Sequence, residues 1–131
     1  MKLPPVIGGF SVRAEPAAAS TLRSGGAGSL LVGGAVFSFR QAGRLNAVLE
    51  VGELTARSDV ADPSFQLGVA NQIGQSLPRA VHVGGRVVYE ASAAAQQTVF
   101  VWFDDHRMLM LLVHGLSDSR PLLEAVLRTG I

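Results

Sequence analysis

Three titratable residues stand side by side at Asp104, Asp105 and His106, and they form the densest group of this kind in the chain. Carboxylates and an imidazole could bind a metal ion or act as an acid–base pair, with His114 or His82 as a further member. Asp is also common in hairpin loops, because its side chain bonds to nearby backbone groups. Neighbours on a tight loop diverge, whereas metal ligands must converge. We therefore expect a loop, with no catalytic and no metal-binding residue, and a hydrolase or metal-dependent enzyme is the less favoured hypothesis.

Other chemical motifs are incomplete. The segment Gly25–Ser29 has the composition of a phosphate-binding loop, but it lacks lysine and precedes a predicted strand, where nucleotide-binding loops need a helix. The chain has no cysteine, which excludes disulfides, thiolate metal sites and cysteine nucleophiles. Glu50 and Glu53 lie three residues apart on one predicted strand, so they face opposite sides and form no carboxylate pair. We expect no cofactor.

A second group of residues could line a pocket for a small apolar ligand between a helix and the sheet. Such pockets are mostly apolar, with few polar groups. The candidates are aromatic residues and methionines of the predicted helix and strands, namely Phe65, Tyr89, Trp102, Met108 and Met110. The same side chains could instead fill the core, because aromatic side chains bury large areas.

Composition limits the class of protein. A chain of 131 residues fits a single domain over residues 1–131, and its 48% hydrophobic content argues against disorder. The net charge is +1 and the arginines are scattered, so we expect no binding of nucleic acid. No apolar run approaches the roughly 18 residues of a transmembrane helix, and the N-terminus does not read as a signal peptide. The apolar excess favours a large core or an interface with a protein partner or a second copy.

The sequence predicts three hairpins and several helices. Turn residues separate the paired strands, which are Leu30–Arg40 with Leu45–Leu54, Arg79–Val83 with Arg86–Ala91, and Thr98–Phe103 with Arg107–His114. A short strand is expected at Phe10–Arg13 after an extended lead-in, and a bulge or a bend at Gly33-Gly34. Helices are expected at Ala17–Arg23, from Asp62-Pro63 to Gly74, and at Arg120–Arg128, where Ser117–Ser119 supply the cap and Gly130 the end.

Val99–Phe103 and Met108–Val113 are apolar at nearly every position. A strand with one face in water should alternate, so these two strands should be central and covered on both faces. The helices starting at Asp62 and Arg120 could cover opposite faces, and the alternative is that another subunit covers one of them. We therefore predict an α+β fold, an antiparallel sheet of about six strands with helices packed on its faces and Arg79–Val83 near an edge.

A resemblance supports this architecture. Leu3-Pro4 with Gly9-Phe10, then Val99–Phe103 followed by Asp104-Asp105, then Met108–Val113 and the closing Pro121–Leu127 stand in the order of a known domain type. This order is similar to that in small exported or lipoprotein-type domains of GC-rich Gram-positive bacteria, domains that have the PsbP-like α/β/α sandwich. The resemblance implies an extracytoplasmic, non-catalytic accessory or interaction module, and it assigns no residue a role. We expect such a module, with self-association as one form of interaction and the small apolar ligand as the alternative.

Overall fold

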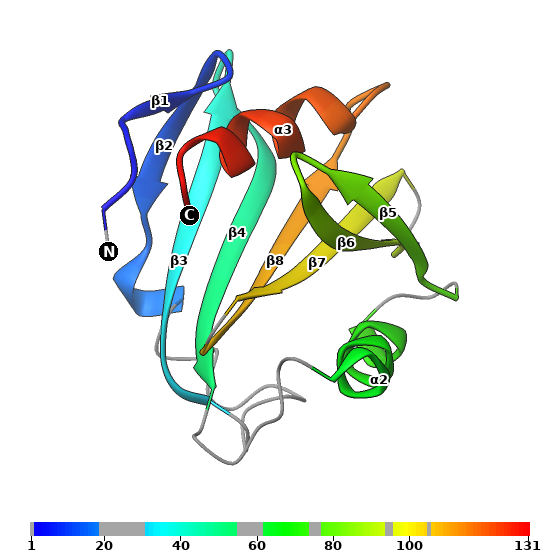
Figure 1. Ribbon diagram of the computed structural model, residues 1–131. Coiled ribbons are helices and arrows are strands. Elements are labelled where there is room, and N and C mark those ends of the chain that lie inside the picture. The colour runs from blue at the N-terminus through cyan, green and yellow to red at the C-terminus, as the bar shows by residue number, and fades with distance from the viewer. Residues whose placement is uncertain (1, 19–30, 55–61, 74–76, 94–95, 105) are drawn as a thin grey trace.

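The fold is that of an α+β protein in which one antiparallel sheet dominates (Figure 1). The computed structural model describes residues 2–18, 31–54, 62–73, 77–93, 96–104 and 106–131. Its strands are β1 (Val6–Ile7), β2 (Phe10–Ala14), β3 (Leu31–Gln41), β4 (Arg44–Leu54), β5 (Arg79–Val83), β6 (Arg86–Ser92), β7 (Gln97–Asp104) and β8 (Arg107–His114). The helices are α2 (Pro63–Ile73) and α3 (Arg120–Arg128). None of the described helices is long and apolar enough to cross a membrane.

The strands lie in the order β1-β2-β3-β4-β8-β7-β6-β5. The antiparallel sheet and its helices confirm the predicted class, but the expected number of about six strands is wrong, because the sheet has eight. The lead-in is not simply extended. Gly8 and Gly9 take φ values of +59° and +85°, so a tight turn folds β1 back onto β2. These two strands then extend the sheet beyond β3.

Turn chemistry explains the hairpins. Ala42 and Gly43 have φ values of +52° and +77°, and Gly84 and Gly85 have +58° and +78°. Two successive left-handed residues define the type I′ turn, whose twist matches that of the flanking strands. The predicted bulge near Gly33 is confirmed, since the β3–β4 register shifts between Leu31 and Gly33.

Helices α2 and α3 each begin where an aspartate accepts a backbone hydrogen bond. Asp62 Oδ1 accepts from the Ser64 N–H at 2.9 Å, directly at the start of α2. Before α3, Asp118 Oδ1 accepts from the Arg120 N–H at 3.1 Å, whereas Ser119 makes no side-chain cap. Each bond satisfies one of the N–H groups that a helix start leaves without a partner.

The end of α3 is also as predicted, with Gly130 in the left-handed region at a φ of +80°. Three other predicted features lie wholly or largely outside the described residues: the helix at Ala17–Arg23, of which only Ala17 and Ala18 are described, as helical residues after Pro16, the segment Gly25–Ser29, and the stop at Gly74.

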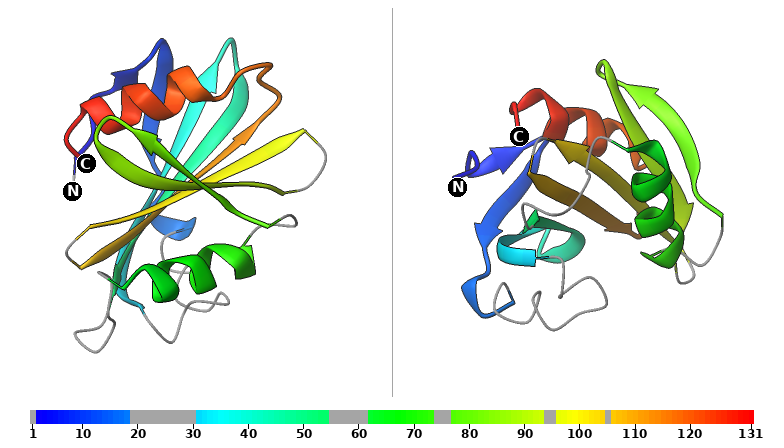
Figure 2. Two further views of the ribbon diagram at one scale, coloured as in Figure 1. Left: turned by 45° about the vertical axis from the view of Figure 1, so that its right-hand side comes forward. Right: turned by 60° about the horizontal axis from the view of Figure 1, so that its bottom comes forward.

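The sheet carries a separate apolar core on each face. Figure 2 shows α3 and α2 on opposite sides of the strands. The larger core joins α3 to the sheet through residues such as Leu123, Trp102 and Leu109. The smaller core joins α2 to β6, β7 and β8, and its buried members include Ala70, Tyr89, Val101 and Met108. The prediction that β7 and β8 are central is confirmed, and β5 lies at an edge as expected. The predicted cover on both faces holds in part, because Met110 and Leu112 of β8 are only half-buried on the side of α2. We call the two sides the α3 face and the α2 face.

Candidate functional site

The Asp104 carboxylate is engaged by a neighbouring guanidinium. Arg107 Nε donates to Asp104 Oδ1 at 3.1 Å and to Oδ2 at 3.0 Å, and Arg107 Nη2 also contacts Oδ2. The two residues are the last cross-strand pair of the β7–β8 hairpin. His106 is exposed beside them, and Asp105 lies outside the described residues. Asp104 thus belongs to β7 and not to the loop in which it was expected, and its ion pair with Arg107 joins β7 to β8 at the end of the hairpin.

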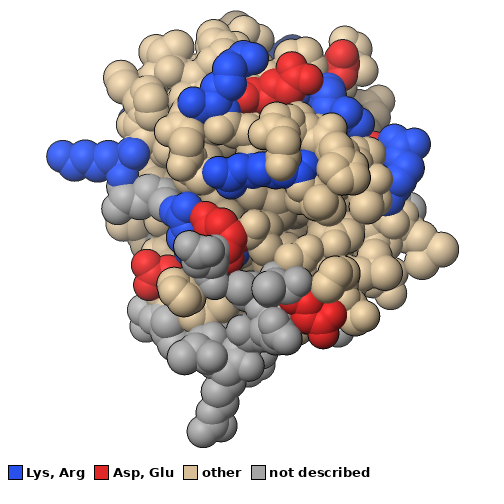
Figure 3. All heavy atoms as spheres, in the orientation of Figure 1, with Lys and Arg blue, Asp and Glu red and all other residues tan. Residues whose placement is uncertain are grey.

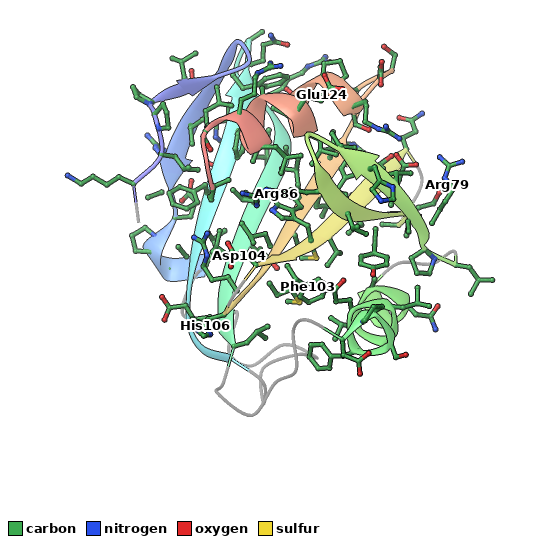
Figure 4. The ribbon with its side chains drawn as sticks, in the orientation of Figure 1. Arg79, Arg86, Phe103, Asp104, His106 and Glu124 are labelled. Atoms are coloured by element: carbon green, nitrogen blue, oxygen red, sulfur yellow. The ribbon has the colours of Figure 1, made fainter. Side chains whose placement is uncertain are left out.

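The three histidines do not come together. His82 lies on β5, His106 in the β7–β8 turn and His114 at the far end of β8, and all three are exposed. Figure 4 shows Asp104 and His106 near one end of the sheet and Glu124 on α3 toward the other. Within the described part of the chain, no group of three or more His, Cys, Asp or Glu residues is placed to hold a metal ion.

The predicted pocket residues are divided between the two faces of the sheet. Trp102 is fully buried in the α3-face core, opposite Leu109. Met108 belongs to the α2-face core, and Met110 packs against that core. Successive side chains of a strand point to opposite faces, so Trp102 cannot share a lining with the two methionines. Its indole Nε1 is buried and has no hydrogen-bond partner among the described residues.

Phe65 and Tyr89 do lie on the α2 face, where they flank Phe103, which was not among the predicted pocket residues. The Phe103 ring packs edge-on against Phe65 at 6.2 Å between centroids and against Tyr89 at 6.5 Å. Tyr89 Oη donates to Gln66 Oε1 at 3.0 Å, and burial raises the pKa of the Tyr89 hydroxyl. These contacts attach α2 to the sheet, so the aromatic residues serve packing in this structure. The neighbouring apolar positions in β7 gave no signal that would single out Phe103.

A hollow of about 420 Å³ separates the β5–β6 hairpin from α3. It is lined by residues of both charge signs and by apolar residues: His82, Val83, Gly84, Arg120, Glu124, Leu127 and Arg128. Nearby, Glu90 binds Arg79 at 2.7 Å and Arg120 at 3.6 Å, which ties β5, β6 and α3 together. The charges are mixed on the visible face as well, where basic and acidic side chains alternate (Figure 3). This surface therefore does not select a strongly charged ligand.

The two edges of the sheet differ in how accessible their backbone is. The β1 edge has only two residues, and Pro4 and Pro5, which lack an N–H group, precede it. The β5 edge has five residues, in the sequence Arg-Ala-Val-His-Val, and its register to β6 is unbroken. Pro78 precedes this strand and Arg79 is charged, but the four residues after Arg79 include neither proline nor a carboxylate. Natural sheets usually protect a free edge with prolines, charges, bulges or short strands. β5 has little such protection.

The turn that joins β5 to β6 determines which backbone groups of β5 are free. In a two-residue hairpin, the residues next to the turn at 84–85 exchange hydrogen bonds, so Val83 and Arg86 form a bonded pair. Bonded and non-bonded pairs then alternate along the strands. Ala80 and His82 fall at non-bonded positions, and their N–H and C=O groups point away from β6. Both residues are exposed.

Comparison with models of protein families, with curated proteins and with solved structures found no match.

Proposed function

We propose that this protein is a non-enzymatic interaction domain that binds an extended protein segment along the edge of β5. The observation that carries the proposal is the outward direction of the Ala80 and His82 backbone groups on an edge strand with little protection. An extended segment that aligns there gains main-chain hydrogen bonds, the recognition mode known as strand addition.

Two further considerations support an interaction role. The carboxylate with most chemical promise, Asp104, already has a structural partner in Arg107. The resemblance to PsbP-like domains implies an accessory module of the same kind. Neither consideration identifies a ligand, so the proposal depends on the β5 edge.

The test is a titration of the ¹⁵N-labelled protein with a short capped peptide of alternating valine and threonine, followed by NMR. The amide signals of Ala80 and His82 should shift, and their hydrogen exchange should slow, because the peptide takes up their free N–H groups. Changes confined to other parts of the molecule, or no change at millimolar peptide in protein that is monomeric by sedimentation, would overturn the proposal.

A matched pair of proline variants sharpens this test. Ala80→Pro removes one outward N–H and leaves the bonds to β6 intact, so it should abolish the peptide response. Val6→Pro is the control, because Val6 has the equivalent outward position on β1 at the opposite edge. The control should bind the peptide like the unchanged protein. Equal loss in both variants would mean that proline perturbs the sheet in general.

A second candidate function is binding of a small apolar ligand on the α2 face. Four neighbouring residues there, Val48, Glu50, Met110 and Leu112, are only half-buried, in contrast to the buried residues of the α3 face. Trp102 fluorescence is a poor reporter of this face because its ring lies on the other one. The methyl signals of Met108 and Met110 should shift on addition of a fatty acid. Unchanged methyl signals across a panel of lipids would exclude this function.

A further inference from the structure

We propose that the segment bound at β5 is β5 of a second copy of this chain, in an antiparallel pair whose two-fold axis passes beside Val81. This inference rests on the proposed function, since it names the partner that occupies the same edge. Pairing about a two-fold axis closes the assembly at two chains and leaves no free β5 edge. The eight strands of each copy would then form one continuous sheet.

The backbone of β5 complements itself in this register. With the axis at Val81, Ala80 lies opposite His82 of the second copy, and His82 lies opposite Ala80. All four residues have their N–H and C=O groups directed toward the partner, so two bonded pairs form with four hydrogen bonds. Val81 faces Val81 of the second copy as the non-bonded pair between them.

Neighbouring registers lose part of this complementarity. An axis at Ala80 places His82 opposite Pro78, which has no N–H to donate. An axis at His82 places Ala80 opposite Gly84, which has left the strand for the turn at a φ of +58°. Among registers that align the outward groups, the one centred on Val81 alone uses every donor and acceptor of Ala80 and His82.

The side chains are compatible with the same register. The guanidinium of Arg79 lies opposite Val83 of the second copy and not opposite the second Arg79. Like charges directly opposite each other destabilise a strand pair, whereas β-branched pairs such as valine with valine stabilise it. Arg79 also keeps its ion pair with Glu90 of its own chain.

The experiment uses the absence of cysteine from the chain, so that an introduced cysteine is the sole thiol. In the proposed register, the two Val81 Cα atoms form a non-bonded pair about 4.5 Å apart, within the range for a disulfide. Val81→Cys should therefore oxidise mostly to a covalent dimer, at a protein concentration where sedimentation detects association.

Cysteine variants at Ala80 and His82 determine the register of the strand pair. Two Ala80 Cα atoms would be separated by two residues along the strands, roughly 8 Å, so Ala80→Cys alone should not cross-link, and neither should His82→Cys alone. An equimolar mixture of these two variants should cross-link as a heterodimer, because Ala80 faces His82 at about 5.5 Å. Cross-linking of either variant alone indicates a different register and overturns the proposal.

Ala80→Pro provides a check that does not depend on oxidation. It removes two of the four intermolecular hydrogen bonds, so the dissociation constant from sedimentation should rise at least tenfold, while circular dichroism shows an unchanged fold. Val6→Pro should leave association unchanged.

The outcomes separate this inference from the proposed function. A protein that binds the valine–threonine peptide at β5 yet stays monomeric, and whose Val81→Cys variant does not cross-link, retains the proposed function and overturns the second copy as partner. A protein that fails in both assays overturns both.

Discussion

Glu50 lies directly opposite Met110 in the β4–β8 register, so a carboxylate in the middle of the sheet has a thioether as its cross-strand neighbour. On its other side it faces Val36 of β3, which is buried. These apolar surroundings desolvate the carboxylate, and burial raises the pKa of Glu50 above its ordinary value of 4.5.

The raised pKa predicts how stability depends on pH. Between pH 4.5 and the higher pKa of the folded state, the folded chain holds the Glu50 proton more tightly than the unfolded chain does. The contribution of this group to the free energy of unfolding is therefore fully present below pH 4.5 and is lost as the pH rises through the folded pKa. Glu50→Gln, which stays neutral, should gain stability relative to the unchanged protein over that window. Urea unfolding at a series of pH values measures the difference.

The control for this experiment is Glu53→Gln on the same strand. Glu53 is exposed, so water solvates its carboxylate in both states. Its substitution should leave the shape of the pH profile as it is in the unchanged protein. A Glu50→Gln profile parallel to that of the unchanged protein would contradict the desolvation argument.

Truncation of Leu123 should be costly, because this residue of α3 is fully buried in the larger core. Leu123→Ala should lower the free energy of unfolding by about 3 kcal/mol, the sum of lost burial and the cavity left behind. Leu67→Ala on α2 is the matched control, since Leu67 is 47% exposed and should cost less than about 1 kcal/mol. Denaturant unfolding of both variants measures the contrast, and similar losses would contradict the assignment of the core.

Ala42 is a non-glycine residue in the left-handed region, at a φ of +52° in the β3–β4 turn. Such a conformation strains an alanine, whereas asparagine tolerates it and Asn-Gly is the preferred type I′ sequence. Ala42→Asn should therefore raise the free energy of unfolding by about 1 kcal/mol. Thermal unfolding measures the gain. Gly43→Ala, which places a side chain at a φ of +77°, should shift the midpoint in the opposite direction.

The Asp104–Arg107 pair should contribute a modest coupling energy. The two side chains are 26% and 25% exposed, and their geometry is bidentate, but water still screens the charges. A double-mutant cycle with Asp104→Asn and Arg107→Gln should give a coupling of about 0.5–1 kcal/mol that falls as salt is added. A coupling near zero at low salt would show that the hairpin end does not depend on this pair.

Much of the fold followed from local signals. Gly84-Gly85 predicted a hairpin turn, Asp62-Pro63 predicted the start of α2, and the unbroken apolar run in β7 predicted cover on both faces. These signals succeed because turn and cap residues act through their own backbone, without help from distant residues.

The candidate pocket was harder to predict for a related reason. When every position of β7 is apolar, the sequence does not show which alternate residues face which helix. The β7–β8 register decides this, because Trp102 pairs with Leu109 and is thereby separated from Met108 and Met110. The burial of Glu50 likewise depends on its cross-strand neighbours in β3 and β8, and the sequence around Glu50 does not indicate which residues these are.

The strand order has a consequence for how quickly the chain folds. β1 to β4 are neighbours both in the chain and in space, as are β5 to β8, so each half is a meander that assembles from nearby residues. The halves join along a single seam between β4 and β8, near which Asn46 Nδ2 donates to a carbonyl 68 positions away, that of His114. Bringing β4 and β8 together closes a long stretch of chain, and this entropy is lost before the hydrogen bonds and contacts between the two strands can form. We therefore expect formation of the β4–β8 seam to be the slow step of folding.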